Sequence, residues 1–282
     1  MMVDEPRLTR LIEEALSEDI GRGDVTTEAI VPESLQGNAR IVLKQEGLVA
    51  GLEISGRVFH TADEGVRFLP RVAEGVLLPV GTLIAAVSGS VHSMLKAERV
   101  ALNILQRMSG IATRTKRFVD AVAGTRAEIT DTRKTPPGLR VLDKLAVRLG
   151  GGVNHRFRLD EMVLIKENHI AAAGGVSAAV ERCLSRLQRR NLNLPVEVEV
   201  KALDELEKVL KFEGIHRVML DNFSVSDLRR AVAIVNGRME LEASGGLTLE
   251  TVQQVAETGV DYISVGALTH SSPAVDISLE LD

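Results

Sequence analysis

From about residue 125 onward, short apolar runs alternate with amphipathic stretches. Six of the runs have the length and composition of strands, and they are Glu128–Thr132, Met162–Lys166, Val196–Val200, Arg217–Asp221, Glu240–Ser244 and Tyr262–Val265. Between them, apolar residues recur at helical spacing near 138–149, 175–190, 202–212, 225–235 and 249–257. Ser224 and Thr248 stand where helix N-caps belong. This regular alternation predicts parallel strands joined by right-handed crossovers.

Polar or small residues end nearly every one of these strands. They are Asp131, Lys166, Glu199, Asp221, Ser244 and Gly266. An open doubly wound sheet and a barrel both satisfy the alternation, but only a barrel brings all of these ends together at one mouth. The pattern therefore favours an α/β barrel.

The first part of the chain has a different pattern. Residues 7–17 have helical spacing, and short runs interrupted by glycines follow to about residue 90, among which Val80–Gly89 is the clearest strand. This favours a small α+β domain. From Ser93 an apolar stripe predicts a helix that leads, with an interruption, into the second domain. We expect residues 1–110 to form the N-terminal domain, residues 111–272 the barrel, and the tail 273–282 to return to the N-terminal domain.

Composition excludes several classes of protein. The chain has 282 residues, of which 45% are apolar, so it can bury a core. Only 2% are aromatic, none is Trp, and the net charge is −5; both argue against nucleic-acid binding. A single cysteine, Cys183, permits no disulfide within one chain. We find no signal peptide and no membrane-spanning run, and so expect a cytoplasmic protein.

Cations gather in one stretch of this acidic chain. Residues 131–169 hold eight Lys/Arg against five Asp/Glu, a net of +3 that leaves −8 for the remainder. Some of them follow helical spacing opposite apolar residues, which is typical of a solvated helix face: Arg140, Lys144 and Arg148. Five others lie at strand ends and in loops: Arg133, Lys134, His155, Arg156 and Lys166. Because an α/β fold keeps its active site at strand ends, these five predict an anion-binding site.

Two glycine-containing segments end the last two strands, ASGGLT at 243–248 and SVGALT at 264–269. Glycine lets backbone N–H groups approach a phosphate, and the N-terminus of a following helix adds to the attraction. Many eight-fold barrels bind phosphate at this position. A glycine can also simply end a strand, but the pairing of two such segments favours a phosphate site.

Carboxylates also lie at these strand ends. Glu197 and Glu199 alternate with valines, so both point to the same face of their strand. Asp221 ends the next strand and is expected to face Glu199. Such a pair suits Mg²⁺ ligation or stabilisation of a developing positive charge. Ion pairs with Lys166 or Lys201 are the alternative.

Sequence motifs typical of several other kinds of site are absent. His155 and His169 do not stand at a spacing typical of a zinc site. The sequence also contains no G-x-S-x-G elbow, Walker A motif or dinucleotide fingerprint.

Several longer motifs are spread over nearly the whole chain. They are GRGDVTT near the N-terminus, ERVALNILQRMSGIATRT (98–115), DTRKTPPGLR (131–140), NHRFRLDEMVLIKENHI (154–170), VEVEV (196–200), MLDN (219–222), EASGG (242–246) and SVGALT (264–269). In these motifs the chain resembles the quinolinate phosphoribosyltransferase family, also called nicotinate-nucleotide pyrophosphorylase (carboxylating). One departure is Pro136, where the family usually has threonine.

The resemblance implies a fold and a reaction. The family joins an N-terminal α+β open-faced sandwich to an incomplete, TIM-like α/β barrel, and works as a homodimer with composite active sites. It converts quinolinate and phosphoribosyl pyrophosphate, with Mg²⁺, to nicotinate mononucleotide, pyrophosphate and CO₂ in NAD biosynthesis.

The resemblance also assigns residues. Ligands of the quinolinate carboxylates and neighbouring phosphates would be Arg133, His155, Arg156 and Lys166. Lys134 would lie near the pyrophosphate, and Arg99 would reach into the partner's site. Glu199 and Asp221 would serve the ribose and the metal. The 5′-phosphate would be held by Ser244, Gly245, Gly246 and Gly266.

Two alternatives stay open at this point. One is a paralogue that acts on another base, which would lack activity with quinolinate. The other is a non-catalytic barrel that binds a phosphate compound, which should lack the dicarboxylate-binding set that this chain has.

Overall fold

A computed structural model of the chain describes residues 5–282. The chain forms two compact units, of which the first contains the residues up to Lys116, Thr135–Gly151 and Ala267–Asp282. The second contains Arg117–Lys134 and Gly152–Gly266. The two units interleave along the chain, because the segment 135–151 and the C-terminal segment from Ala267 both pack with the first unit.

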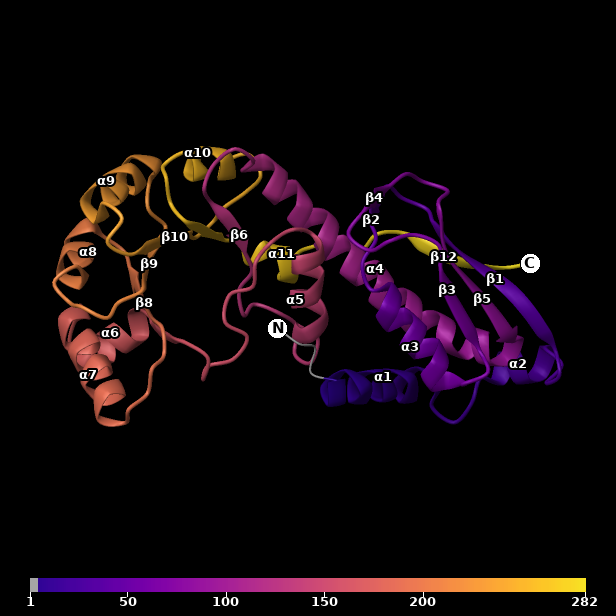
Figure 1. Cartoon of the computed structure of the whole chain (residues 1–282). Helices are drawn as coiled ribbons and strands as arrows, with labels where there is room; N and C mark the ends of the chain where they lie inside the picture. The colour runs from indigo at the N-terminus through magenta and orange to yellow at the C-terminus, as the bar shows by residue number, and fades with distance from the viewer. Residues whose placement is uncertain (1–4) are drawn as a thin grey trace. The chain divides into compact units, whose positions relative to one another are not determined.

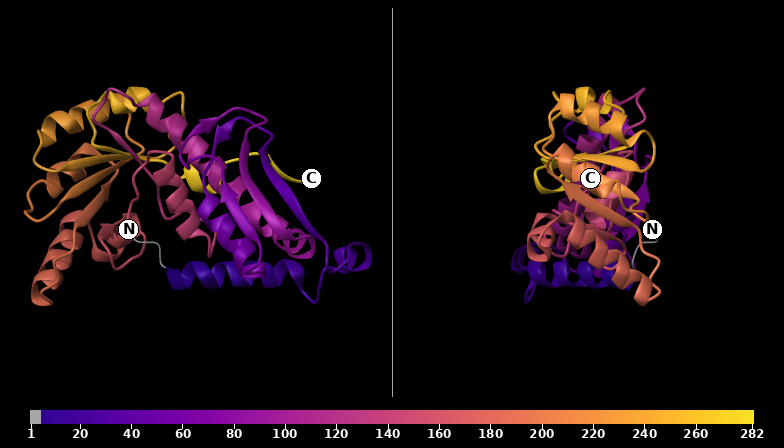
Figure 2. Two further views of the ribbon diagram at one scale, coloured as in Figure 1. Left: turned by 45° about the vertical axis from the view of Figure 1, so that its right-hand side comes forward. Right: turned by 90° about the vertical axis from the view of Figure 1, so that its left-hand side faces the viewer.

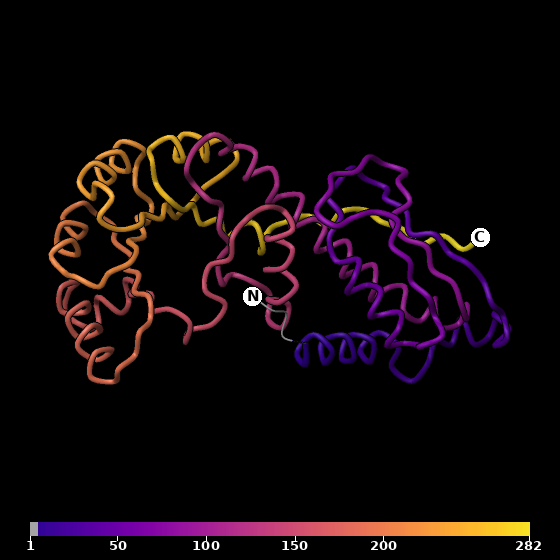
Figure 3. The backbone as a smooth tube through the Cα atoms, viewed as in Figure 1, coloured from indigo at the N-terminus to yellow at the C-terminus, as the bar shows by residue number. Residues whose placement is uncertain are grey.

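The first unit is built on a four-stranded antiparallel sheet in the order β12-β1-β5-β3. Its strands are β1 (Gln36–Leu43), β3 (Arg67–Pro70), β5 (Leu83–Ser90) and β12 (Ile277–Leu281). A small ribbon pairs β2 (Gly47–Leu48) with β4 (Leu77–Leu78). The segment nearest the C-terminus, yellow in Figure 3, runs beside the N-terminal strand, and Leu281 lies opposite Ala39.

Six helices belong to or begin in this unit. They are α1 (Glu5–Ile20), α2 (Val25–Ile30), α3 (Leu52–Ala62), α4 (Val91–Ala121), α5 (Arg140–Leu149) and α11 (Ala267–His270). Figure 2 shows α3 and the first half of α4 against the strands. Two of the helices are joined by an ion pair, in which Arg107 of α4 donates two hydrogen bonds to the buried Asp143 of α5, at 2.8 and 2.9 Å. This pair helps to hold the segment 135–151 in the first unit.

The long helix α4 differs from its prediction. We expected an interruption after about residue 108, but the helix is continuous for 31 residues. Gly110 has a packing role, because a Cβ built there would lie 2.0 Å from the carbonyl oxygen of Pro273. The glycine therefore allows the C-terminal segment to pass directly over the helix. Glycine is tolerated inside a helix at a cost of only about 1 kcal/mol relative to alanine.

The second unit contains a six-stranded parallel sheet in the order β6-β11-β10-β9-β8-β7. Its strands are β6 (Glu128–Thr130), β7 (Val163–Ile165), β8 (Val196–Val200), β9 (Arg217–Asp221), β10 (Glu240–Ser244) and β11 (Tyr262–Ser264). Its helices are α6 (Glu167–Ala173), α7 (Val176–Arg189), α8 (Leu203–Val209), α9 (Val225–Val235) and α10 (Val252–Ala256). The sheet curves but stays open between β6 and β7, with α7 to α10 along its outer side (Figure 1). This confirms the predicted incomplete α/β barrel beside an N-terminal α+β domain.

The alternation along these strands separates two chemically different faces. The apolar positions, among them Val198, Val218 and Ile263, are fully buried toward the helices. The alternate positions carry polar side chains on the inner face. There Arg217 contacts Glu242 at 2.9 Å and its guanidinium lies over the ring of Tyr262 at 3.6 Å. Charged side chains thus fill the inside of this barrel.

The predicted elements agree closely with the structure in this unit. Three strands have the predicted bounds, and the other three are one or two residues shorter. Ser224 caps α9, accepting a hydrogen bond from the N–H of Asp227. The prediction for Thr248 was wrong, because a turn follows it and α10 has Thr251 at its N-cap. None of the helices within residues 5–282 is long and apolar enough to cross a membrane.

Candidate functional site

Eleven of the twelve predicted site residues belong to the second unit. They lie at or just beyond the carboxyl ends of its strands. Arg99 is the exception and lies on α4 in the first unit, where 55% of its side-chain surface is exposed. The structure thus brings the predicted residues to one end of the parallel sheet and leaves Arg99 in the other unit.

Two arginines form the cationic centre of this end. The guanidinium of Arg156 donates through Nη1 to the carbonyl of Met162 at 2.8 Å. Its Nε is buried and has no hydrogen-bond partner among residues 5–282. Burial, followed by the nearby charge of Arg133, lowers the pKa of Arg156. Two neighbouring guanidinium groups with an unused buried donor form a site for an anion, because an anion would satisfy the donor and offset the repulsion.

The loop that carries Arg156 is fixed by a buried carboxylate. Asp131, at the end of β6, is fully buried and accepts hydrogen bonds from Asn154 Nδ2 at 2.7 Å and from the N–H of His155 at 2.9 Å. Val153 forms a parallel bridge with Thr130 immediately before this loop. The sequence predicted Asp131 only as a strand end, and its role is to orient residues 154–156.

The imidazole of His155 points into the barrel interior. Its Nδ1 accepts a hydrogen bond from the N–H of Arg156 at 2.8 Å. Its Nε2 lies 3.0 Å from Glu197 Oε2 and 3.6 Å from Glu242 Oε2. Both ring nitrogens are therefore engaged with the protein in this structure, and contact between His155 and quinolinate stays a prediction.

The two interior carboxylates were not predicted as site residues. Glu197 and Glu242 have no exposed surface. Burial raises the pKa of each to about 7, and the charge of Glu197 further raises the pKa of Glu242. The sequence placed Glu197 on the same face as Glu199, which is correct. It could not show that this face is the barrel interior, because both faces of a parallel strand are buried.

Lys166 and Glu199 form an ion pair at the ends of β7 and β8. The distance from Lys166 Nζ to Glu199 Oε2 is 3.1 Å. Lys166 is about half exposed, with 48% of its side-chain surface accessible, whereas Glu199 is 11% exposed. The ion pair that we considered as an alternative is therefore present. His169 Nδ1 accepts a hydrogen bond from the backbone N–H of Lys166 and so caps α6.

Asp221 and the glycine pair are joined by Asn222, a residue that the sequence did not single out. Asn222 has a φ of 58°, donates its N–H to Ser244 O at 2.8 Å and its side-chain amide to Asp221 Oδ2 at 2.9 Å. A Cβ on Gly245 would lie 2.2 Å from Asn222 Oδ1. Gly245 and Gly246 both have positive φ, which favours glycine. A polar residue directly after a strand is the signal that could have identified Asn222.

The predicted contribution of a helix N-terminus to the phosphate site needs correction at ASGGLT (243–248) only, because α11 begins at Ala267, directly after Gly266 of the second segment. Gly245 and Gly246 are followed by a loop and a turn, and α10 begins only at Val252. Any phosphate held here would bind loop N–H groups rather than the start of that helix. Lys134, also predicted for this end of the sheet, is exposed, and its N–H donates to Thr132 Oγ1 at 3.0 Å.

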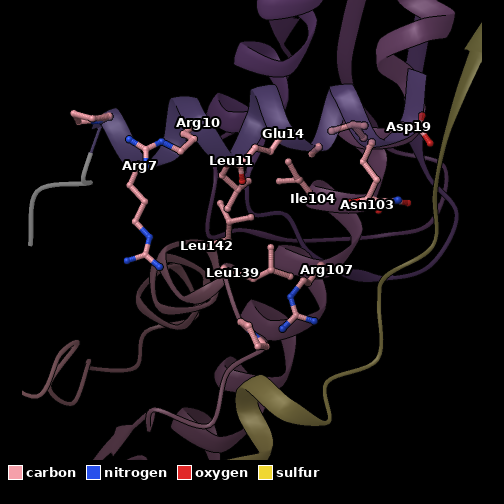
Figure 4. Close-up of a pocket in the computed structure, with 16 residues that line it drawn as sticks. Arg7, Arg10, Leu11, Glu14, Asp19, Asn103, Ile104, Arg107, Leu139 and Leu142 are labelled. Carbon is pink, nitrogen blue, oxygen red and sulfur yellow. The ribbon is translucent and has the colours of Figure 1, made fainter. Parts of the chain in front are cut away.

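A large cavity lies apart from the predicted residues, within the first unit. It has a volume of about 970 Å³ and is lined by α1, α4, the start of α5 and the loop before it. Figure 4 shows Leu11, Ile104 and Leu142 lining it, with Arg7 and Arg10 above and Arg107 below. None of the predicted site residues lines this cavity.

The fold and the candidate site together define an α/β barrel protein with a cationic cluster, suited to anions, at the ends of its strands. Residues 24–109 match the family described as quinolinate phosphoribosyl transferase, N-terminal domain, and residues 111–280 match its C-terminal domain. The chain belongs to the quinolinate phosphoribosyltransferase family. Members are decarboxylating pentosyltransferases that form nicotinate mononucleotide from quinolinate, and this is the activity of the chain.

Relatives and solved structures agree with this assignment. The chain is 45% identical to quinolinate phosphoribosyltransferase [decarboxylating] 1b of Nicotiana tabacum, over 98% of this chain and 82% of that protein. It is 44% identical to a chloroplastic nicotinate-nucleotide pyrophosphorylase [carboxylating] of Arabidopsis thaliana, over 98% and 83%. The fold matches the crystal structure of NadC from Streptococcus pyogenes with a TM-score of 0.94, at 37% identity over 100% and 99% of the two chains.

Proposed function

We propose that the cationic end of the parallel sheet binds quinolinate and phosphoribosyl pyrophosphate and transfers the phosphoribosyl group to the pyridine nitrogen. The observation that carries this assignment of residues is the pair Arg133 and Arg156, with the buried, unused Nε of Arg156. Both substrates are strongly anionic, so a cationic pocket is required, and guanidinium groups recognise carboxylates with two parallel hydrogen bonds. Arg133, Arg156 and Lys166 then hold the two quinolinate carboxylates.

The phosphoribosyl part is held at the neighbouring strand ends. Ser244, Gly245 and Gly246 after β10, with Gly266 after β11, offer backbone N–H groups to the 5′-phosphate. Asn222 supports this loop, since its side chain occupies the space that a Cβ on Gly245 would need. Lys134 is exposed and positively charged, which suits contact with the pyrophosphate.

Glu199 and Asp221 serve the reacting carbon and the metal. Departure of pyrophosphate leaves positive charge on the ribose, which nearby carboxylates stabilise. Both residues offer hard carboxylate oxygens at adjacent strand ends, and this donor set fits Mg²⁺, which keeps several water and phosphate ligands of its own. When bound, Mg²⁺ supplies positive charge to the pyrophosphate. Lys166 keeps Glu199 oriented through its 3.1 Å contact.

Loss of CO₂ uses the substrate's own chemistry. Once the pyridine nitrogen carries the phosphoribosyl group it is positively charged, and it stabilises the electron pair that the breaking carbon–carboxylate bond leaves on the adjacent ring carbon. A proton from water then takes the place of the lost carboxylate. No organic cofactor is needed for that step. Arg133 and Arg156 keep the ring in place while the carboxylate leaves.

The activity assay tests the substrate assignment. Purified protein with quinolinate, phosphoribosyl pyrophosphate and Mg²⁺ should release CO₂ and nicotinate mononucleotide in equal amounts. Nicotinate has one carboxylate and should be a far poorer substrate. Equal use of nicotinate and quinolinate would contradict a dicarboxylate pocket, and loss of activity with quinolinate would favour a paralogue acting on another base.

We further propose a homodimer, working in the cytoplasm, in which Arg99 enters the active site of the partner. Its support is the exposed side chain of Arg99 on α4. Within residues 5–282, this side chain forms one ion pair, a 4.0 Å contact with its neighbour Glu98. The lone cysteine suits a reducing compartment.

Complementation tests the composite site. Arg99→Ala and Lys134→Ala proteins should each be inactive, but mixing them and allowing subunits to exchange should restore activity. Random exchange places both defects in one site of each heterodimer and leaves the other intact, so recovery should approach about a quarter of wild type. No recovery after demonstrated exchange would place Arg99 outside its partner's site.

A further inference from the structure

A buried network lies beneath the proposed quinolinate site, and the chemistry proposed above does not use it. It joins His155 to Glu197 of β8 and Glu242 of β10, and the side chains of all three are at most 5% exposed. Arg217 contacts Glu242 from β9 at 2.9 Å. Burying two carboxylates and an arginine costs free energy that an apolar core would not, so the network is expected to have a function.

A bound metal ion would be one explanation of this cluster. The ligand atoms of His155, Glu197 and Glu242 lie within 4.8 Å of one another. Oε1 of each glutamate is buried without a hydrogen-bond partner among the described residues. The three residues therefore have the spacing of a metal site.

The tautomer of His155 argues against a metal. Because Nδ1 accepts the N–H of Arg156, it holds a lone pair, and the neutral ring carries its proton on Nε2. Nε2 is the atom that faces both carboxylates. A protonated nitrogen is a donor and cannot ligate a cation, so Nε2 donates to Glu197. Arg217 already supplies positive charge to this cluster.

The network ends at Arg156. The ring of His155 accepts a hydrogen bond from the backbone N–H of Arg156 at 2.8 Å. The side chain of Arg156 is fixed separately, because its Nη1 donates to Met162 O at 2.8 Å. These two contacts leave Nε as the buried donor still to be satisfied. An arginine fixed in this way loses little rotamer freedom when it binds a carboxylate, which favours affinity.

We propose that Glu197, with Glu242 beside it, is a positioning residue for quinolinate: it holds the ring of His155, and the ring holds Arg156 in the orientation that receives a substrate carboxylate. The proposal rests on the role proposed above for Arg156. It also changes the role of His155, which acts through Arg156 and not as a direct ligand of quinolinate through its ring nitrogens.

Two substitutions at Glu197 test this role through kinetics. Glu197→Gln keeps an oxygen that accepts the Nε2–H, so the KM for quinolinate should stay within about threefold of wild type. Glu197→Met fills the space without an acceptor and should raise that KM by about tenfold or more, while the KM for phosphoribosyl pyrophosphate changes less than about threefold. An equal rise in both KM values would indicate general structural damage and overturn the proposal.

Glu240→Gln is the matched control. Glu240 lies two residues before Glu242 on β10 and contacts the same arginine, Arg217, at 2.9 Å, but no contact joins it to His155 in the described part of the chain. Its substitution should leave both KM values unchanged. A rise in the quinolinate KM as large as that of Glu197→Met would assign the effect to Arg217 and contradict the role of Glu197.

A spectroscopic measurement keeps the test decisive if Glu197→Met does not fold. In protein labelled with ¹⁵N at histidine, the signals of His155, assigned with His155→Gln, should show the Nε2–H tautomer. Saturation with quinolinate should not change that tautomer. Conversion to the imidazolium or to the Nδ1–H tautomer on binding would make His155 a direct ligand, and a stoichiometric metal ion that Glu197→Met loses would make the network a metal site.

Two variants separate the positioning role of Glu197 from the carboxylate site at Arg156. A normal quinolinate KM in Glu197→Met, together with a raised KM in Arg156→Ala, would remove only the positioning role. A normal KM in Arg156→Ala would remove the proposed carboxylate site itself.

Discussion

Replacing Arg156 with alanine should weaken quinolinate binding by about 2–5 kcal/mol, the usual effect of removing one partner from a desolvated charge pair. The guanidinium is half-buried, its Nε has no partner within residues 5–282, and Arg133 lies close enough to lower its pKa. In the variant, a quinolinate carboxylate would lose a charged donor that water cannot fully replace. Titration calorimetry with quinolinate measures the loss directly.

Arg158→Ala is a suitable control for this measurement. Arg158 lies two residues away in the same loop and carries the same charge, but it is exposed and rests against the ring of Phe157. Its removal should change quinolinate affinity by less than about 0.5 kcal/mol, as is usual for a surface substitution. If both variants lost affinity equally, the overall positive charge of the loop, and not the position of Arg156, would determine binding.

Replacing Glu199 or Asp221 with alanine should mainly lower kcat. Neither side chain is proposed to contact the pyridine carboxylates, and both are proposed to stabilise charge that develops as pyrophosphate leaves. Loss of one electrostatic group of this kind typically lowers kcat by about 10²–10³-fold. Removing Glu199 also releases Lys166 from its 3.1 Å ion pair, so the KM for quinolinate should rise little or fall.

Steady-state kinetics with each substrate varied in turn separates these outcomes. Glu207→Ala, which removes an exposed carboxylate from α8, serves as the control and should behave as wild type. Normal turnover with weaker quinolinate binding in Glu199→Ala would reverse the assignment and place this carboxylate in the pyridine site.

The sequence predicted the strands of the second unit well, because strand-like and helix-like segments alternate regularly along it and apolar and polar residues alternate within strands. VEVEV at 196–200 has valines toward the helices and glutamates toward the interior, and its predicted bounds agree with β8. The helix α6 was missed because it spans only seven residues and none of them is buried, so it leaves no apolar period. The continuity of α4 through Gly110 could not be predicted either, since it depends on contact with Pro273, which is distant in sequence.

The site was predicted to the extent that its residues end strands. Arg133, Arg156 and Lys166 were found because a charge follows each apolar run or loop. The direction of the His155 imidazole was not predicted, because it depends on Glu197 and Glu242, which are both distant in sequence. Asn222 was missed for a similar reason: its φ of 58° and its contact with Gly245 are properties of the folded loop and not of a motif.

The pairing of β1 with β12 has a consequence for synthesis on the ribosome. Strand β1 is translated early, but its outer hydrogen-bonding edge is covered only by residues 277–281. Until these residues emerge, the nascent N-terminal sheet presents an open edge that can pair with another chain. Closing the sheet also requires contacts between opposite ends of the sequence, which is slow because of the entropy of closing so long a loop.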